Sequence, residues 1–167
     1  STYKFSIFNS DTVIKTSGGK RATFVADYSD DVPSYQIVKN VENLYVENID
    51  FENFPMIKFE NCDNIIFNNC SFIDFENNGI VFRDCSNIAI LNSKFTNCGN
   101  QISDSSNSGY SIRIVGDTQS PAENVLIENC TFENSCGKCI SIIYGRFAET
   151  DIFAHIIFNN VCIFARN

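Results

Sequence analysis

A nine-residue segment recurs along the chain, and this repeat constrains the fold more than any other feature. NIIFNNCSF at residues 64–72 and NVLIENCTF at 124–132 carry the same Asn, Cys and Phe near their ends. Related segments contain an Asn at the same place, with spacings of 21, 23, 37 and 31 residues: Asn48, Asn69, Asn92, Asn129 and Asn160. The basal period is about 22 residues, and the longer gaps place extra residues in loops on one face.

The repeated segments predict β-strands. Apolar, β-branched and aromatic residues alternate with polar ones, and a second short apolar strand follows each of the first four copies, at 56–59, 79–82, 110–114 and 139–143. Leucine-rich repeats also carry an Asn column, but they need several Leu in each repeat. This chain has only Leu44, Leu91 and Leu126. We therefore predict a parallel β-solenoid in which each repeat bends at its Asn and is followed by a second short strand.

The N-I-x-I-x-N-C-x-F units resemble the right-handed parallel β-helix repeats of the pectin-lyase-like superfamily, over roughly residues 41–163. The resemblance implies an all-β, right-handed parallel β-helix of about five to six coils. We expect residues 1–40 to form an irregular first coil or N-terminal cap and residues 41–167 to form the repeats, within one domain. The resemblance says little about activity, because one scaffold carries many functions.

The Asn column predicts a structural ladder. An Asn tolerates the left-handed conformation that a bend needs, and stacked coils lie about 4.8 Å apart, so neighbouring amides can bond to one another. Asn69-Cys70-Ser71 and Asn129-Cys130-Thr131 are also N-glycosylation sequons. We expect both Asn side chains to point inward as ladder residues, which leaves neither free to carry a glycan.

The aromatic and thiol columns predict the core. Phe51, Phe72, Phe95 and Phe132 share one inward position, which Ile163 continues. Cys70 and Cys130 are expected to be buried thiols, two coils apart. Cys62 and Cys85 lie on adjacent coils and are candidates for a disulfide, as are Cys98 and Cys136, with Cys139 as a competitor. A zinc site at Cys136 and Cys139 is the alternative, without the second C-x-x-C pair that such a site needs.

The outward positions of the first strand are apolar where solvent contact predicts polar residues. They are Tyr45, Ile66, Ala89, Leu126 and Ile157. A loop, a flanking segment or another chain usually covers such a face. The last repeat is apolar and carries no evident cap, which favours stacking on a further copy or domain. We therefore expect self-association or contact with neighbouring domains of a longer assembly, with polysaccharide as a further candidate partner.

The candidate catalytic residues are few and lack a recognisable pattern. Two long insertions, at 116–123 and 144–151, follow the second strand. An outward residue of that strand, Arg113, and residues of the insertions are expected to meet in one groove: Arg113, Asp117, Tyr144, Arg146, Glu149 and Asp151. The superfamily resemblance suggests a polysaccharide lyase, which would use Ca²⁺, or a glycoside hydrolase with a carboxylate pair. Neither motif is present. His155, which occupies a position held by Asn in other repeats, is expected to serve a turn.

Composition narrows the remaining classes. The chain carries a formal charge of −8 from 20 acidic and 12 basic residues, so a nucleic-acid partner is not expected. Its longest apolar run, at 139–144, is too short to span a membrane. Cysteine usage favours an extracellular or surface-exposed setting. The sequence favours a non-catalytic structural or surface-display module without a metal or cofactor, such as part of a fibre, spike or adhesin, over a small carbohydrate-active enzyme.

Overall fold

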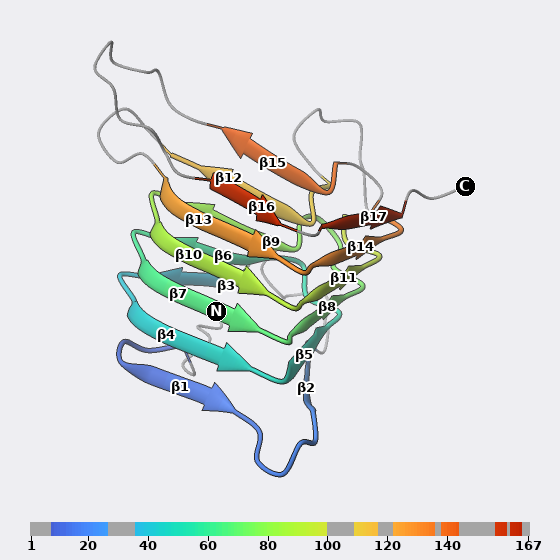
Figure 1. Ribbon diagram of the computed structural model, residues 1–167, viewed down its shortest axis with the longest axis horizontal. Coiled ribbons are helices and arrows are strands. Elements are labelled where there is room, and N and C mark those ends of the chain that lie inside the picture. Colours follow the sequence, from blue (N-terminus) through green and yellow to red (C-terminus); the bar gives the residue numbers. More distant parts are fainter. Residues whose placement is uncertain are drawn as a thin grey trace.

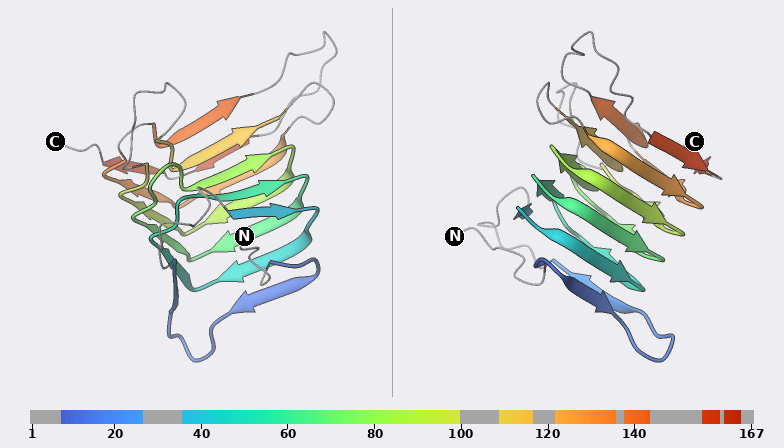
Figure 2. Two further views of the ribbon diagram at one scale, coloured as in Figure 1. Left: turned by 180° about the vertical axis from the view of Figure 1, so that it is seen from behind. Right: turned by 60° about the vertical axis from the view of Figure 1, so that its left-hand side comes forward.

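The computed structural model is a stack of parallel β-strands, and it describes residues 8–26, 36–99, 109–116, 122–135, 138–143, 156–159 and 161–164. The strands form three parallel sheets of six, six and five strands, here named A, B and C. Figures 1 and 2 show the strands as layers that repeat along one axis. Within the described residues the fold is all β.

The sheets take one strand each from successive turns of the chain. Sheet A contains β1 (Thr12–Lys15), β4 (Glu42–Glu47), β7 (Asp63–Asn68), β10 (Ser86–Leu91), β13 (Glu123–Glu128) and β16 (Ile156–Asn159). Sheet B contains β2 (Ala22–Val25), β5 (Ile49–Glu52), β8 (Ser71–Ile73), β11 (Lys94–Thr96), β14 (Thr131–Glu133) and β17 (Cys162–Phe164). Sheet C contains β3 (Gln36–Lys39), β6 (Ile57–Glu60), β9 (Ile80–Arg83), β12 (Ile112–Val115) and β15 (Ile140–Ile143).

Each coil therefore has three strands, in the order A, B, C. The first coil is β1–β3, the fifth is β13–β15, and β16 and β17 begin a sixth. This confirms the predicted parallel β-helix of five to six coils. The nine-residue segment holds two strands, β7 and β8, on either side of the bend predicted at Asn69, and the second short strand of the repeat is the third strand of the coil. The corner shifts the alternation of inward and outward residues, so two short strands look like one bent strand in the sequence.

Left-handed Asn and Asp residues form the corners of the coils. All 16 described non-glycine residues with positive φ are Asn or Asp, with φ between 50° and 60°. They fall into columns, of which one holds Asn48, Asn69, Asn92 and Asn129. A left-handed residue costs about 1–2 kcal/mol for most side chains, and Asn and Asp tolerate it best. The repeated Asn of the sequence is thus a requirement of the turn.

Stacked phenylalanine rings fill the space inside sheet B. Phe72 is fully buried and lies between Phe51 and Phe95, with ring centroids 5.3 and 4.6 Å away and interplanar angles of 8° and 15°. Phe132 and Phe24 continue the column at its two ends, at 5.0 and 5.9 Å from their neighbours. This confirms the predicted aromatic column. Because each ring contacts the rings above and below, the core holds successive coils in register.

The first coil continues the regular stack. β1, β2 and β3 pair in register with the next coil, although residues 1–40 were expected to form an irregular coil or a cap. Phe8 is buried and packs against Phe51 and Phe59, at ring-centroid distances of 6.2 and 5.7 Å. The first coil is less buried than the others, and the side chain of Val13 is 61% exposed.

Candidate contact surface

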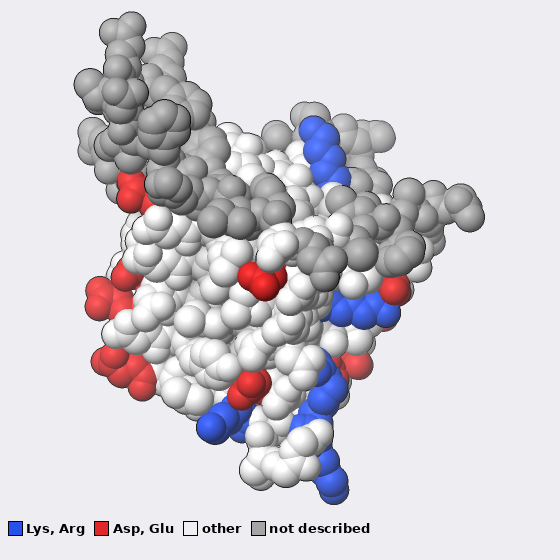
Figure 3. Space-filling view, viewed as in Figure 1, with Lys and Arg blue, Asp and Glu red and all other residues white. Residues whose placement is uncertain are grey.

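The outer face of sheet A carries an uncharged column of side chains through its first five strands, and the backbone register continues it to the sixth. Backbone pairing places these residues directly above one another: Val13, Tyr45, Ile66, Ala89, Leu126 and Ile157. We call this set the central column. Val13 is exposed and Tyr45, Ile66, Ala89 and Leu126 are partly exposed, while the side chain of Ile157 lies outside the described residues. The predicted apolar outward column is therefore present, and Figure 3 shows a largely uncharged surface on this side.

Two further columns flank the central one. On one side lies an asparagine column: Asp11, Asn43, Asn64, Asn87 and Asn124. Its side chains bond to one another through the first three coils and between the fourth and fifth, while Asn87 donates to Asp63 instead of Asn64. In that column Asn64 Nδ2 donates to Asn43 Oδ1 at 2.9 Å. On the other side lies a mixed column: Lys15, Glu47, Asn68, Leu91, Glu128 and Asn159. Asn68 Nδ2 donates to the Tyr45 hydroxyl and to Glu47 Oε1, at 3.1 Å each. These bonds fix the side chains around the central column.

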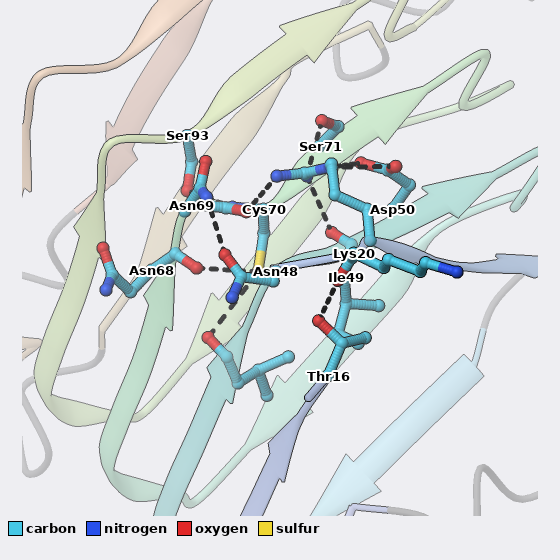
Figure 4. Close-up of polar contacts among 12 residues, drawn as sticks. Thr16, Lys20, Asn48, Ile49, Asp50, Asn68, Asn69, Cys70, Ser71 and Ser93 are labelled. Atoms are coloured by element: carbon cyan, nitrogen blue, oxygen red, sulfur yellow. Dashed lines mark hydrogen bonds and ion pairs between the residues drawn. The ribbon is translucent and has the colours of Figure 1, made fainter. Parts of the chain in front are cut away.

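The outer face of sheet B is charged, and hydrogen bonds from Arg21 link its first three coils. The Arg21 guanidinium donates to both carboxylate oxygens of Asp50, to Ser71 Oγ at 3.0 Å and to the Asn69 carbonyl at 2.7 Å. Figure 4 shows these acceptors converging from the second and third coils. Burial raises the pKa of the Asp50 carboxyl, but hydrogen bonds from Arg21 and Ser71 outweigh it, so that pKa is lowered. Sequence reasoning missed this cluster, because its members are up to 50 residues apart.

The outer face of sheet C holds the only described member of the predicted catalytic groove. The Arg113 guanidinium lies over the Tyr110 ring, 5.5 Å from its centroid. Asp117, Tyr144, Arg146, Glu149 and Asp151 lie outside the described residues, as does His155, so their predicted meeting stays a prediction. Elsewhere on this face Glu60 forms ion pairs with Lys39, at 2.6 Å, and with Lys58. Hydrogen bonds from those two lysines lower the pKa of Glu60.

The predicted asparagine ladder is present, but it lies on the outside. Asn69 Nδ2 donates to Asn48 Oδ1 at 2.6 Å, and Asn129 Nδ2 donates to Asn92 Oδ1 at 3.2 Å. Asn92 Nδ2 bonds to Asn68 instead of Asn69. Asn69, Asn92 and Asn129 are exposed, so the expectation that they point inward is wrong.

The residue that follows each ladder Asn takes the inward position. These residues are Ile49, Cys70, Ser93 and Cys130, and all four are buried. The corner therefore turns the Asn itself toward solvent, and burial no longer argues against modification at the two sequons. Asn160, the fifth expected ladder residue, lies outside the described residues.

The predicted Cys62–Cys85 disulfide is absent. The two cysteines stack on adjacent coils as expected, yet both are buried free thiols. Parallel in-register neighbours hold their Cα–Cβ bonds side by side, which leaves the Cβ atoms near the coil spacing of about 4.8 Å and beyond the usual 3.5–4.5 Å of a disulfide. Their sulfurs instead contact carbonyls of the preceding coil, that of Val38 for Cys62 and that of Phe59 for Cys85, at 3.6 Å each.

The other cysteines also serve the core. Cys70 and Cys130 are buried free thiols, which confirms that prediction, and burial raises the pKa of Cys70 to about 11. Cys98 is a free thiol as well, and its desolvation raises its pKa to about 12. The strand pairing of Phe95 with Phe132 places Ser135, and not Cys136, above Cys98. Cys136 itself lies outside the described residues, so its pairing has no structural account.

Three parallel sheets in register agree with a family comparison. Residues 34–163 match the family described as right handed beta helix region. The chain belongs to this right-handed β-helix family. No curated protein and no solved structure matches the chain. The family supplies the fold and its handedness, and it leaves the activity of this β-helix open.

Two further observations concern metals and membranes. Across the described ranges of this β-helix, no group of three or more His, Cys, Asp or Glu side chains is placed to hold a metal ion. In the same part of the chain, no helix has the length and apolar character needed to cross a membrane.

Proposed function

We propose that this β-helix is a non-catalytic structural or surface-display module, of the kind that forms part of a fibre, spike or adhesin. Its contact surface is the outer face of sheet A. The observation that carries the proposal is the central column, which stays uncharged from Val13 in the first coil to Leu126 in the fifth. The chain as a whole has a net charge of −8, so an uncharged strip of this length is unusual on its surface.

Burial energy supports a partner for this face. Covering a large apolar side chain contributes about 1 kcal/mol or more, and the strip spans on the order of 20 Å along the coil axis. Asn and Tyr side chains on the same face are already held by hydrogen bonds within the chain. Little conformational entropy is therefore lost when the face docks.

The proposed partners are another copy of the chain or neighbouring domains of a longer assembly, with polysaccharide as a further candidate. The acidic balance disfavours nucleic acid, because phosphates would be repelled. An extracellular or surface-exposed location suits a display role. A small polysaccharide lyase or glycoside hydrolase is the second candidate, and the observation that favours it is Arg113 stacked on Tyr110 on the outer face of sheet C.

The proposal is tested by two measurements on the purified chain. Release of reducing ends and of unsaturated products is followed on a panel of acidic and neutral polysaccharides, with and without Ca²⁺. The solution mass is measured in parallel. The proposal predicts no turnover and a mass above that of one chain at high concentration. Robust cleavage by a strict monomer, lost in Arg113→Ala, would establish the enzyme instead.

A further inference from the structure

We infer that the partner of the sheet A outer face is a second copy of this chain, packed face to face about a two-fold axis that runs along β7. The strands of the two copies then run in the same direction, while the order of the coils is reversed. This inference rests on the proposed function, because it takes that face to be the contact surface. It adds the identity of the partner, its orientation and its register.

The sizes of the central-column side chains favour this arrangement. With the axis at Ile66, the second coil of one copy faces the fourth coil of the other, which sets Tyr45 against Ala89. Val13 faces Leu126, and Ile66 faces its own counterpart. The largest side chain of the column thus meets the smallest, as close packing between two faces requires.

The charges of the mixed column fit the same register. Lys15 of one copy faces Glu128 of the other, so opposite charges meet at both ends of the interface. Glu47 faces Leu91, and Asn68 faces its own counterpart. In the asparagine column, amide side chains face one another, as Asn43 does with Asn87. Within these three columns no pair of like charges meets, as a specific interface needs. At the start of β7, Asp63 lies opposite its own counterpart, but its carboxylate already accepts hydrogen bonds from Ser86 and Asn87.

Other arrangements fit less well. An axis along the coil stack keeps the coil order and sets Tyr45 against Tyr45 and Ala89 against Ala89, which leaves crowding in one place and a void in another. A reversed order centred between β7 and β10 sets Glu47 against Glu128, and these like charges would repel. Of these three arrangements, side-chain size and charge both favour the one with the two-fold axis along β7.

The extent of the face sets the strength of the pair. Five coils at about 4.8 Å and strands of about five residues give a footprint of roughly 400 Å² per copy, or about 800 Å² in total, which is below the roughly 1,200 Å² of stable specific interfaces and in the range of weak, transient contacts. We therefore expect a weak, reversible dimer with a dissociation constant on the order of 100 µM. A weak pair of this kind is best detected by covalent cross-linking.

Site-directed cross-linking tests the register. Facing sheets lie about 10 Å apart, too far for a direct disulfide, so a bis-maleimide with a span of about 8 Å is used. Ile66→Cys alone should give a cross-linked dimer. Tyr45→Cys and Ala89→Cys should each give little alone, and their mixture should give a dimer with a yield about ten-fold higher. The unsubstituted chain controls for its own thiols, and Ile73→Cys on the outer face of sheet B controls for chance encounters.

Charge reversal gives an independent check of the same register. Glu128→Lys should weaken the dimer by about ten-fold, and Lys15→Glu combined with Glu128→Lys should restore it. Strong cross-linking of Tyr45→Cys to itself would overturn the reversed order. A chain that gives no cross-linked dimer with any of these variants would overturn the pair, yet it would leave the non-catalytic proposal in place if no polysaccharide is cleaved. Cleavage would overturn the proposed function itself.

Discussion

The outer faces of sheets A and B are built on the same coils, yet they carry opposite chemistry. Both sheets bury apolar side chains toward one interior, and Asn corners join them. Outside, sheet B is covered by charges that satisfy one another, such as Arg21 with Asp50 and Lys94 with Glu133. Sheet A instead keeps a central column without charge. Folding of the stack depends mainly on its inner residues. The outer residues can therefore differ between faces, according to what each face contacts.

The largest expected effect tests the shared interior. Phe72→Ala removes the middle of the phenylalanine column and should lower the free energy of unfolding by about 3–5 kcal/mol. Ile73→Ala changes the next residue, which is partly exposed on the outer face of sheet B, and should cost less than about 1 kcal/mol. Denaturant unfolding of the two variants measures the difference. Equal losses would mean that the inner and outer positions of sheet B are wrongly assigned.

A smaller effect is expected from the charges of sheet B. Arg21→Ala removes a guanidinium that bonds to two other coils and should cost about 1–2 kcal/mol, allowing for its partial exposure. Lys15→Ala, on the same coil but on the sheet A side, should cost less than about 0.5 kcal/mol. Thermal unfolding near neutral pH compares the two.

The same ion pair predicts a pH dependence. The folded-state pKa of Asp50 is lowered, so its contribution to stability is complete above the unfolded pKa of about 3.9 and is lost as the pH falls further. In Arg21→Ala this part of the acid dependence should be reduced. Unfolding curves of the parent chain and the variant, collected between about pH 2 and 6, provide the measurement. Parallel curves for the two proteins would show that the pair does not stabilise the fold.

The corner that both faces share should respond about as strongly as Arg21. Asn92→Ala places a less tolerant residue at φ 50° and should cost about 1–2 kcal/mol, whereas Asn92→Gly should cost less, because glycine adopts this conformation freely. Chemical unfolding of the two variants separates backbone strain from the loss of the ladder hydrogen bond, which both variants lack. Equal costs for the two variants would mean that the lost amide bond, which they share, matters more than the backbone conformation.

The sequence carried enough information for the stack because the constraints repeat. The Phe72 column, the uncharged positions of the central column and the left-handed Asn residues all recur at the coil period. The sequence led to a wrong prediction where one residue type fits both an inward and an outward position. Asn69 was expected to point inward, but a corner residue in the left-handed conformation turns its side chain outward and passes the inward position to Cys70.

Features that join distant residues were harder to predict. The Cys62–Cys85 pair had a suitable coil spacing, and Cys62 N donates to Cys85 Sγ, but parallel side-chain vectors hold the two Cβ atoms too far apart for a disulfide. Arg21 gave no signal, since it lies in a turn outside the repeats and reaches Asn69 of the third coil. The proposed catalytic groove depended on loops without any period, and only Arg113 among its residues lies within the described structure.

The central claim is that sheet A presents a contact surface and sheet B does not, and one matched pair of variants tests it most directly. Ile66→Lys and Ile73→Lys place the same new charge on the same coil, on the outer faces of sheets A and B. Sedimentation velocity from about 10 µM to 1 mM should show reversible association for the parent chain and for Ile73→Lys, and a monomer throughout for Ile66→Lys, with unfolding free energies within about 0.5 kcal/mol of one another. Association that survives in Ile66→Lys, or is lost equally in both variants, would contradict the claim.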